Sequence, residues 1–288
     1  MIKLISFMVI ATMLFLSMKS DKPAYRIFKE NGKASSYESM LEAACKSDIV
    51  FFGELHDLPI GHWLEYELTK DLFLKKGSRL TLGAEMFEAD NQLILNEYLS
   101  GMVKDKNFEA EARLWPNYKT DYKPLLSFAR DSSLKFIATN IPRRYASMVN
   151  AGGFEALNKI APEALALIAP LPIDYDSGLT CYKELLKSMG NTPSHTTANI
   201  AKAQAIKDAT MAHFILANYQ AGNLFFHFNG SYHSDHFQGI VWYLKQANPR
   251  LNITVISSIQ QTDLEDLAKE SEGLADFILV FPESMTHN

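Results

Sequence analysis

The sequence is short of the features that mark several protein classes. Among its 288 residues only Cys45 and Cys181 are cysteines, too few for a disulfide framework, so we expect two free thiols rather than a bridge. The formal net charge of −5 provides no basic excess, which argues against a nucleic-acid-binding protein. Internal repeats, low-complexity tracts and flexible linkers are also missing, so the sequence predicts a single domain over residues 21–288.

The motifs of several enzyme folds are missing as well. No Gly-x-Gly-x-x-Gly follows the first core strand and no phosphate-loop lysine motif occurs, which disfavours a nucleotide-binding fold. Ser231 lies in Asn-Gly-Ser-Tyr-His and lacks the Gly-x-Ser-x-Gly elbow of an α/β hydrolase. Cys181 has no histidine close to it in sequence. Neither residue type therefore offers a nucleophile in a known context.

The first twenty residues differ in composition from the rest of the chain. Lys3 precedes an apolar stretch from Leu4 to Leu16, a pattern typical of a signal peptide and short for a membrane span. Met18 is large for a cleavage site, so residues 1–20 are either a signal peptide or an uncleaved N-terminal anchor. No cysteine follows the stretch for lipoprotein anchoring. We expect an exported protein, periplasmic or associated with the cell envelope.

Hydrophobic residues make up 47% of the chain, enough for a full core, and apolar runs alternate with helical patterns. The predicted strands are 48–53, 80–87, 134–139, 223–229, 252–257 and 276–281, after a small hairpin turning at Asn31-Gly32. This alternation predicts an α/β fold, with a mostly parallel central sheet flanked by helices. The stretch 152–195, helical but interrupted by Pro and Gly, predicts a helical insertion or lid.

Polar side chains stand where the predicted strands end. Glu54 and His56 follow the first core strand, Glu85 lies near the end of the second, and Arg143 and His233 follow two later strands. The carboxyl ends of parallel strands share one edge of a sheet, so we expect these five residues to form one site. Two imidazoles and a carboxylate suit zinc, manganese or iron, which makes His56, His233 and Glu54 the candidate metal ligands.

Three of the polar residues have structural alternatives. Glu85 lies within an apolar strand and would be costly to bury alone, so it must have a partner. Arg143 is one candidate for that partner, or else it presents a bidentate fork to an anionic ligand. His227 lies inside an apolar strand and is expected to be a hydrogen-bonded core histidine rather than a ligand.

The segment 115–124 mixes tryptophan, tyrosine and lysine side chains. Flat rings next to basic groups suit a planar anionic ligand, and a tyrosine phenolate can serve as a ligand of haem iron. Ordinary packing of a loop and a helix start is the alternative.

Five segments, in this order, carry a family resemblance: Gly53-Glu54-Leu55-His56-Asp57, Gly83-Ala84-Glu85-Met86-Phe87, Asn140-Ile141-Pro142-Arg143, Asp208-Ala209-Thr210-Met211-Ala212 and Asn229-Gly230-Ser231-Tyr232-His233. Together they resemble the ChaN-like haem-binding uptake family of the Tiki-type superfamily, over roughly residues 45–260. That superfamily also includes metal-dependent proteases and erythromycin-esterase-like hydrolases. The late motif departs from the usual Gly-Asn-Gly-His of ChaN-like proteins, and the lipoprotein cysteine is missing.

The resemblance implies functional roles for Glu54, His56, Glu85, Arg143 and His233. It also implies haem as a cofactor with an axial tyrosine, for which Tyr118 and Tyr122 are the candidates.

Two functions therefore stand side by side. The first is an exported haem- or iron-binding protein involved in haem or iron uptake. The second is a metal-dependent hydrolase, in which a divalent transition metal lowers the pKa of a bound water and a carboxylate acts as general base. The expected partner is haem or a small anionic ligand, and we expect no binding of nucleic acid. Membrane association through the N-terminus and formation of a homodimer both stay open.

Overall fold

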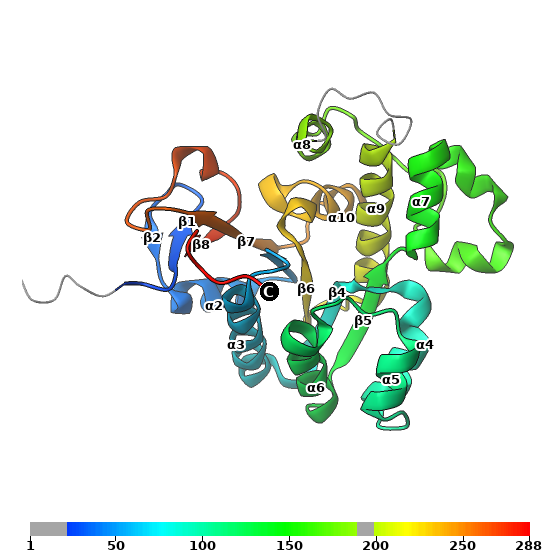
Figure 1. Ribbon diagram of the computed structural model, residues 1–288, viewed down its shortest axis with the longest axis horizontal. Helices are drawn as coiled ribbons and strands as arrows, with labels where there is room; N and C mark the ends of the chain where they lie inside the picture. Colours follow the sequence, from blue (N-terminus) through cyan, green and yellow to red (C-terminus); the bar gives the residue numbers. More distant parts are fainter. Residues whose placement is uncertain (1–21, 189–198) are drawn as a thin grey trace, which may run out of the picture.

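The computed structural model describes residues 22–188 and 199–288 (Figure 1). The predicted N-terminal signal, 1–20, and residues 189–195 of the predicted insertion lie outside this part of the chain. Within it, no helix is long and apolar enough to cross a membrane.

The fold is built on an eight-stranded sheet with the order β2-β1-β8-β7-β3-β6-β4-β5. Its strands are β1 Arg26–Lys29, β2 Ala34–Ser35, β3 Ile49–Glu54, β4 Leu80–Glu88, β5 Lys135–Asn140, β6 Leu224–Gly230, β7 Ile253–Gln261 and β8 Phe277–Pro282. From β8 to β5 every neighbouring pair is parallel, and β1 joins the edge antiparallel to β8. The α/β architecture with a mostly parallel sheet is confirmed.

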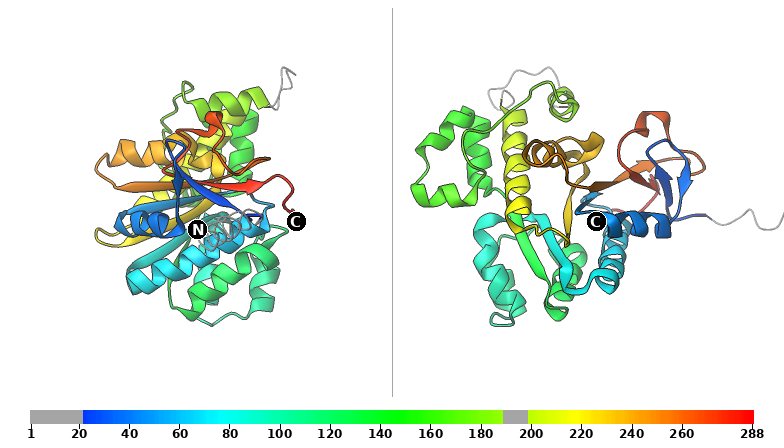
Figure 2. Two further views of the ribbon diagram at one scale, coloured as in Figure 1. Left: turned by 90° about the vertical axis from the view of Figure 1, so that its left-hand side faces the viewer. Right: turned by 180° about the vertical axis from the view of Figure 1, so that it is seen from behind.

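Helices cover both faces of this sheet, as the rotated views of Figure 2 show. Side chains alternate along a strand, so Val50 and Phe52 of β3 enter one core while Ile49 and Phe51 enter the other. The first core packs against α2 Tyr37–Lys46, α3 Pro59–Lys76, α4 Gln92–Leu99, α5 Asp105–Glu111 and α6 Lys123–Asp131. The second packs against α9 Ile200–Asn218 and α10 Ile240–Ala247. Such double coverage explains why the strand sequences are apolar throughout.

Short-range signals in the sequence account for the ends of several elements. Ser36 caps α2 by accepting a hydrogen bond from the Ser39 amide at 3.2 Å. Pro59 occupies the first turn of α3, and Gly77 ends it with φ of 56°. The expected hairpin forms between β1 and β2, with Gly32 at φ of 75°. Cys45 and Cys181 are free and half-buried, as expected.

The region of the predicted insertion forms a helical layer beside the sheet. It contains two short 3-10 segments, Phe154–Lys159 and Pro162–Leu167, and α8 Thr180–Ser188. The 3-10 segments join α7 Arg143–Gly152 and α9 in one apolar cluster, and α8 packs on α9. Sequence patterns missed α5 and the π-helical turn Tyr118–Tyr122, which precedes α6.

Candidate functional site

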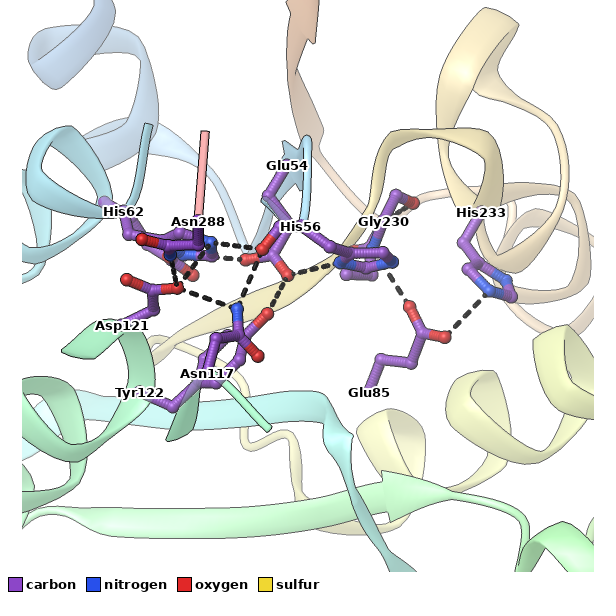
Figure 3. Close-up of polar contacts among 12 residues, drawn as sticks. Glu54, His56, His62, Glu85, Asn117, Asp121, Tyr122, Gly230, His233 and Asn288 are labelled. Carbon is purple, nitrogen blue, oxygen red and sulfur yellow. Dashed lines mark hydrogen bonds and ion pairs between the residues drawn. The ribbon is translucent and has the colours of Figure 1, made fainter. Parts of the chain in front are cut away.

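The carboxyl ends of β3, β4, β5 and β6 meet at one edge of the sheet, where the polar residues were expected. Glu54 at the end of β3 lies opposite Gly230 at the end of β6. In β4 the pairing with β5 shifts register between Ala84 and Glu88, an irregularity that contains Glu85. Figure 3 shows Glu54, His56, Glu85 and His233 gathered along this edge. The topology therefore brings together residues that are far apart in the sequence.

Glu85 and His233 form an enclosed ion pair. His233 Nε2 lies 3.1 Å from Glu85 Oε1, and the Gly230 amide donates to Glu85 Oε2 at 2.9 Å. On its other side His233 Nδ1 bonds to Asp208 of α9, which accepts a further hydrogen bond from Tyr182 of α8 at 2.9 Å. The partner that Glu85 required is thus His233.

The alternative that Arg143 is the partner of Glu85 is wrong. Arg143 opens α7 with an exposed side chain, and it forms no ion pair with the described residues. It lines the same cleft as Glu85 instead. His227 is a hydrogen-bonded core histidine, as expected, with Thr139 at 2.8 Å and Asn229 at 3.0 Å.

The electrostatics of the pair favour its ionised form. Burial by itself would lower the pKa of His233, but the charges of Glu85 and Asp208 outweigh it and raise this pKa to about 9. Burial would likewise raise the pKa of Glu85, yet the His233 imidazolium and, more weakly, Lys207 hold it below its usual range. Burial raises the pKa of Asp208. At neutral pH the histidine is therefore a buried cation between two acidic groups.

His56 is the accessible histidine of the site. Its Nδ1 lies 2.7 Å from Glu54 Oε1, and its side chain is 43% exposed. The ring meets the edge of Trp115 with centroids 4.7 Å apart, and its Nε2 side lies against Gly230. A Cβ on Gly230 would stand 2.6 Å from Nε2, so only glycine leaves room for this ring. Burial lowers the pKa of His56, but the hydrogen bond and charge of Glu54 raise it overall.

Glu54 connects His56 with a cluster of buried groups behind it. Tyr122 donates to Glu54 Oε1 at 2.7 Å. His62 Nδ1 lies 3.4 Å from Glu54 Oε2 and 3.1 Å from Glu65 Oε2. Of the described residues, Glu54, His62 and Glu65 are the group whose ligand atoms all lie within 4.8 Å of one another. Side chains of the types that ligate metal ions therefore lie close together at this edge.

The predicted metal ligands His56 and His233 take separate partners. Figure 3 shows the Glu85 carboxylate reaching His233 on one side and the Gly230 amide, beside His56, on the other. Their assignment to a common metal ion, together with Glu54, stays a prediction.

The two candidate haem tyrosines lie inside the first core. Tyr118 packs against the ring of Phe108, and the Tyr122 hydroxyl is engaged by Glu54. Burial raises the pKa of both phenols. Neither residue lines the cleft beside His56, so an axial role for either stays a prediction.

Sequence reasoning missed His62, Glu65 and Asp208. A signal existed for Glu65, because the apolar stripe of α3 through Leu64 and Leu68 places it on the buried face, three residues after His62. Asp208 was noticed only as part of a motif, although it is a charged residue in a helix that is mostly buried.

A cleft with a volume of about 1140 Å³ opens beside His56 and Glu85. Two of the cations that line the cleft form ion pairs: Arg113 pairs with Glu88, and Arg144 pairs with Asp90. Arg143 and Lys207 form no ion pair with any described residue. The lining residues are His56, Glu85, Glu88, Ala112, Arg113, Leu114, Trp115, Pro116, Asn140, Ile141, Arg143, Arg144, Ser147 and Lys207.

One plant protein is similar to part of this chain in sequence. The chain is similar to Protein RETICULATA-RELATED 5, chloroplastic, of Arabidopsis thaliana, with 27% identity over 198 residues and 64% of this chain covered. The match spans 26% of the plant protein, about a quarter of its length.

Among solved structures, ChaN of Campylobacter jejuni has a TM-score of 0.65 at 18% identity, covering 89% of this chain and 96% of that chain. A Bacillus cereus protein has a TM-score of 0.51 at 13% identity, covering 90% and 95%. At these identities the structures show a shared fold.

The sequence model of one family matches residues 40–244, well over half of the chain and including every strand end of the site. The chain belongs to the family described as haem-binding uptake, Tiki superfamily, ChaN.

Proposed function

We propose that this protein binds haem in the cleft beside His56, as part of haem or iron uptake. The observation that carries the proposal is the accessible imidazole at one wall of the cleft, with an aromatic ring and two cations, Arg143 and Lys207, beside it. The Campylobacter jejuni relative is described as binding haem cofacially, which supports haem as the ligand class.

The donor set fits haem. When Glu54 accepts from His56 Nδ1, the second nitrogen of the neutral ring, Nε2, carries the lone pair that an iron ligand needs. A carboxylate behind a ligating imidazole also fixes its orientation and raises its basicity. Histidine is a common proximal ligand of haem iron, so we assign that part to His56 rather than to a buried tyrosine.

The other residues of the cleft suit the ring system and the carboxylates of haem. Trp115 offers an apolar surface next to His56 for a flat ring system. Arg143 and Lys207 form no ion pair within the described part of the chain, and they suit the two carboxylates of haem. The volume of about 1140 Å³ slightly exceeds the usual limit of small-molecule pockets, about 1,000 Å³, which leaves room for a ligand as large as haem. When bound, haem would supply the iron that His56 faces.

A haem titration followed by absorption spectroscopy tests the proposal. The wild-type protein should shift the Soret band with saturation near one haem per chain, and His56→Ala should lose that shift. His213→Ala, which changes a half-buried histidine of α9 away from the cleft, is the matched control and should bind as the wild type. Full binding by His56→Ala together with loss in Tyr118→Phe/Tyr122→Phe would instead support the tyrosine assignment and refute ours.

We also propose that the chain is exported, to the periplasm or cell envelope. The support is the Lys3 charge followed by the apolar stretch Leu4 to Leu16. Fractionation of cells that produce the full chain should recover it outside the cytoplasm, and deletion of residues 1–20 should retain it inside.

A metal-dependent hydrolase is the second candidate. It is favoured by the placement of the charged His233–Glu85 pair beside the accessible His56, at a cleft large enough for a substrate. These groups could hold and move protons between His56 and Glu85 during hydrolysis. Metal-loaded protein should then hydrolyse ester or peptide substrates, and Glu85→Gln should abolish turnover; no activity over a broad substrate panel would remove this candidate.

A further inference from the structure

Behind His56, three enclosed side chains form a cluster, and of these only Glu54 also contacts the histidine proposed to hold haem. Glu54 ends β3, while His62 and Glu65 lie one turn apart on α3. The side chains of Glu54 and Glu65 are 0% exposed and that of His62 is 3% exposed. His62 and Glu65 do not line the cleft, so this Glu54–His62–Glu65 cluster is separate from the haem-binding surface.

The cluster has unsatisfied oxygens. Glu54 Oε2 and Glu65 Oε1 have no hydrogen-bond partner among the described residues, although both are buried. A buried carboxylate oxygen without a partner is costly, so such atoms usually mark a ligand or an added proton. Both belong to residues whose ligand atoms come within 4.8 Å of one another and of His62.

The charges around the cluster also do not balance. Asp121 adds a third carboxylate, with Oδ2 at 3.8 Å from His62 Nε2. The ion pairs of Glu54, Glu65 and Asp121 in the described part of the chain are all with His56 or His62, and none is with lysine or arginine. With all three carboxylates ionised, even two protonated imidazoles leave a net negative charge in the interior, and burial together with the charge of Glu54 raises the pKa of Glu65 to about 8.

We propose that Glu54, His62 and Glu65 hold a divalent transition-metal ion buried between β3 and α3. Two carboxylates and one imidazole suit borderline metals such as zinc, manganese or iron(II). The ion supplies the missing positive charge and gives the orphan oxygens a partner. Because Glu54 also binds His56 and Tyr122 through Oε1, a metal on Oε2 anchors the histidine of the cleft from behind.

The competing occupant is a proton shared by Glu54 and Glu65, and metal analysis separates the two. The full chain, purified without a polyhistidine tag, is stripped with a chelator and reloaded separately with Zn²⁺, Co²⁺ and Mn²⁺. After gel filtration, elemental analysis should find about one equivalent of at least one metal per chain. Cobalt should also give a visible absorption band, and loading should raise the melting temperature.

Glu65→Gln is the informative variant, because it keeps the shape of the side chain while removing its charge. We expect its metal affinity to fall by at least about tenfold. Glu67→Gln is the matched control, because Glu67 lies on the same helix and pairs with Lys70 outside the cluster, and it should load as the wild type. His56→Ala should keep its metal while losing haem, so failure of the haem proposal and failure of this one give different results.

Two outcomes would overturn the proposal. One is less than about a tenth of an equivalent in the wild-type protein with all three metals, a result that does not depend on any variant folding. The other is full loading of Glu65→Gln combined with loss in His56→Ala, which would place the metal in the cleft instead.

Discussion

Gly230→Ala tests the packing that holds His56 at the wall of the cleft. The new Cβ would lie 2.6 Å from His56 Nε2 and 2.8 Å from Cε1, whereas ordinary contacts begin at 3.4 Å. The backbone at Gly230, with φ of −55° and ψ of 138°, accepts alanine without strain. The imidazole must therefore move away from Gly230 by most of an ångström, which disturbs its hydrogen bond to Glu54.

The magnitude follows from the bond that is lost. A hydrogen bond to a charged group contributes about 1.5–3 kcal/mol, and the 43% exposure of His56 places this one at the lower end. Replacing glycine by alanine returns about 0.4–1 kcal/mol through the unfolded chain. The free energy of unfolding should fall by about 0.5–1.5 kcal/mol in total, while haem affinity falls by at least about tenfold, or 1.4 kcal/mol.

Urea unfolding followed by circular dichroism and haem titration by absorption measure the two effects. Gly61→Ala is the control, since its Cβ, in the first turn of α3, would meet no atom within 4 Å. It should raise stability by about 0.5–1 kcal/mol and leave haem binding unchanged. Haem affinity equal to that of the wild type in Gly230→Ala, with its stability intact, would refute the close packing of His56 on Gly230.

Three further predictions concern the surrounding groups. Nuclear magnetic resonance should find His233 with a pKa near 9, and Asp208→Asn should move this pKa toward 6.5. Because the pKa is higher in the folded protein, the stability that His233 contributes is complete below pH 6.5 and is lost as the pH rises through 9. A measured pKa below 6.5 would contradict the ion pair. Tyr122→Phe should lower the free energy of unfolding by about 1.5–3 kcal/mol, because buried Glu54 loses a donor, and unchanged stability in denaturant titrations would show that this bond is not formed. Arg143→Gln should weaken haem binding by about two- to fivefold and reduce its dependence on salt, and an affinity that does not change at low salt would exclude Arg143 from ligand contact.

Much of the site was accessible from the sequence because a parallel sheet places its carboxyl ends together. Glu54, His56, Glu85 and His233 each follow or end an apolar run, so recognising the strands was enough to group them. The sequence did not show which of these side chains would pair with each other. Whether Glu85 meets Arg143 or His233 depends on how α7 and the turn after β6 are placed, which hydrophobic patterns do not encode.

The Glu54–His62–Glu65 cluster was harder to predict for a similar reason. His62 and Glu65 enter the site only because α3 is rotated so that this face meets the end of β3. The aromatic segment around Tyr122 was recognised by composition, but its π-helical turn buries the phenol against Glu54 instead of exposing it. Helix orientation against the sheet, a tertiary property, decided each of these cases.

A crystal structure of the protein with haem is the most direct test of the account. We expect the iron beside Nε2 of His56, with the carboxylates of haem toward Arg143 and Lys207. Haem bound outside this cleft, or held by a tyrosine after rearrangement of the first core, would contradict it.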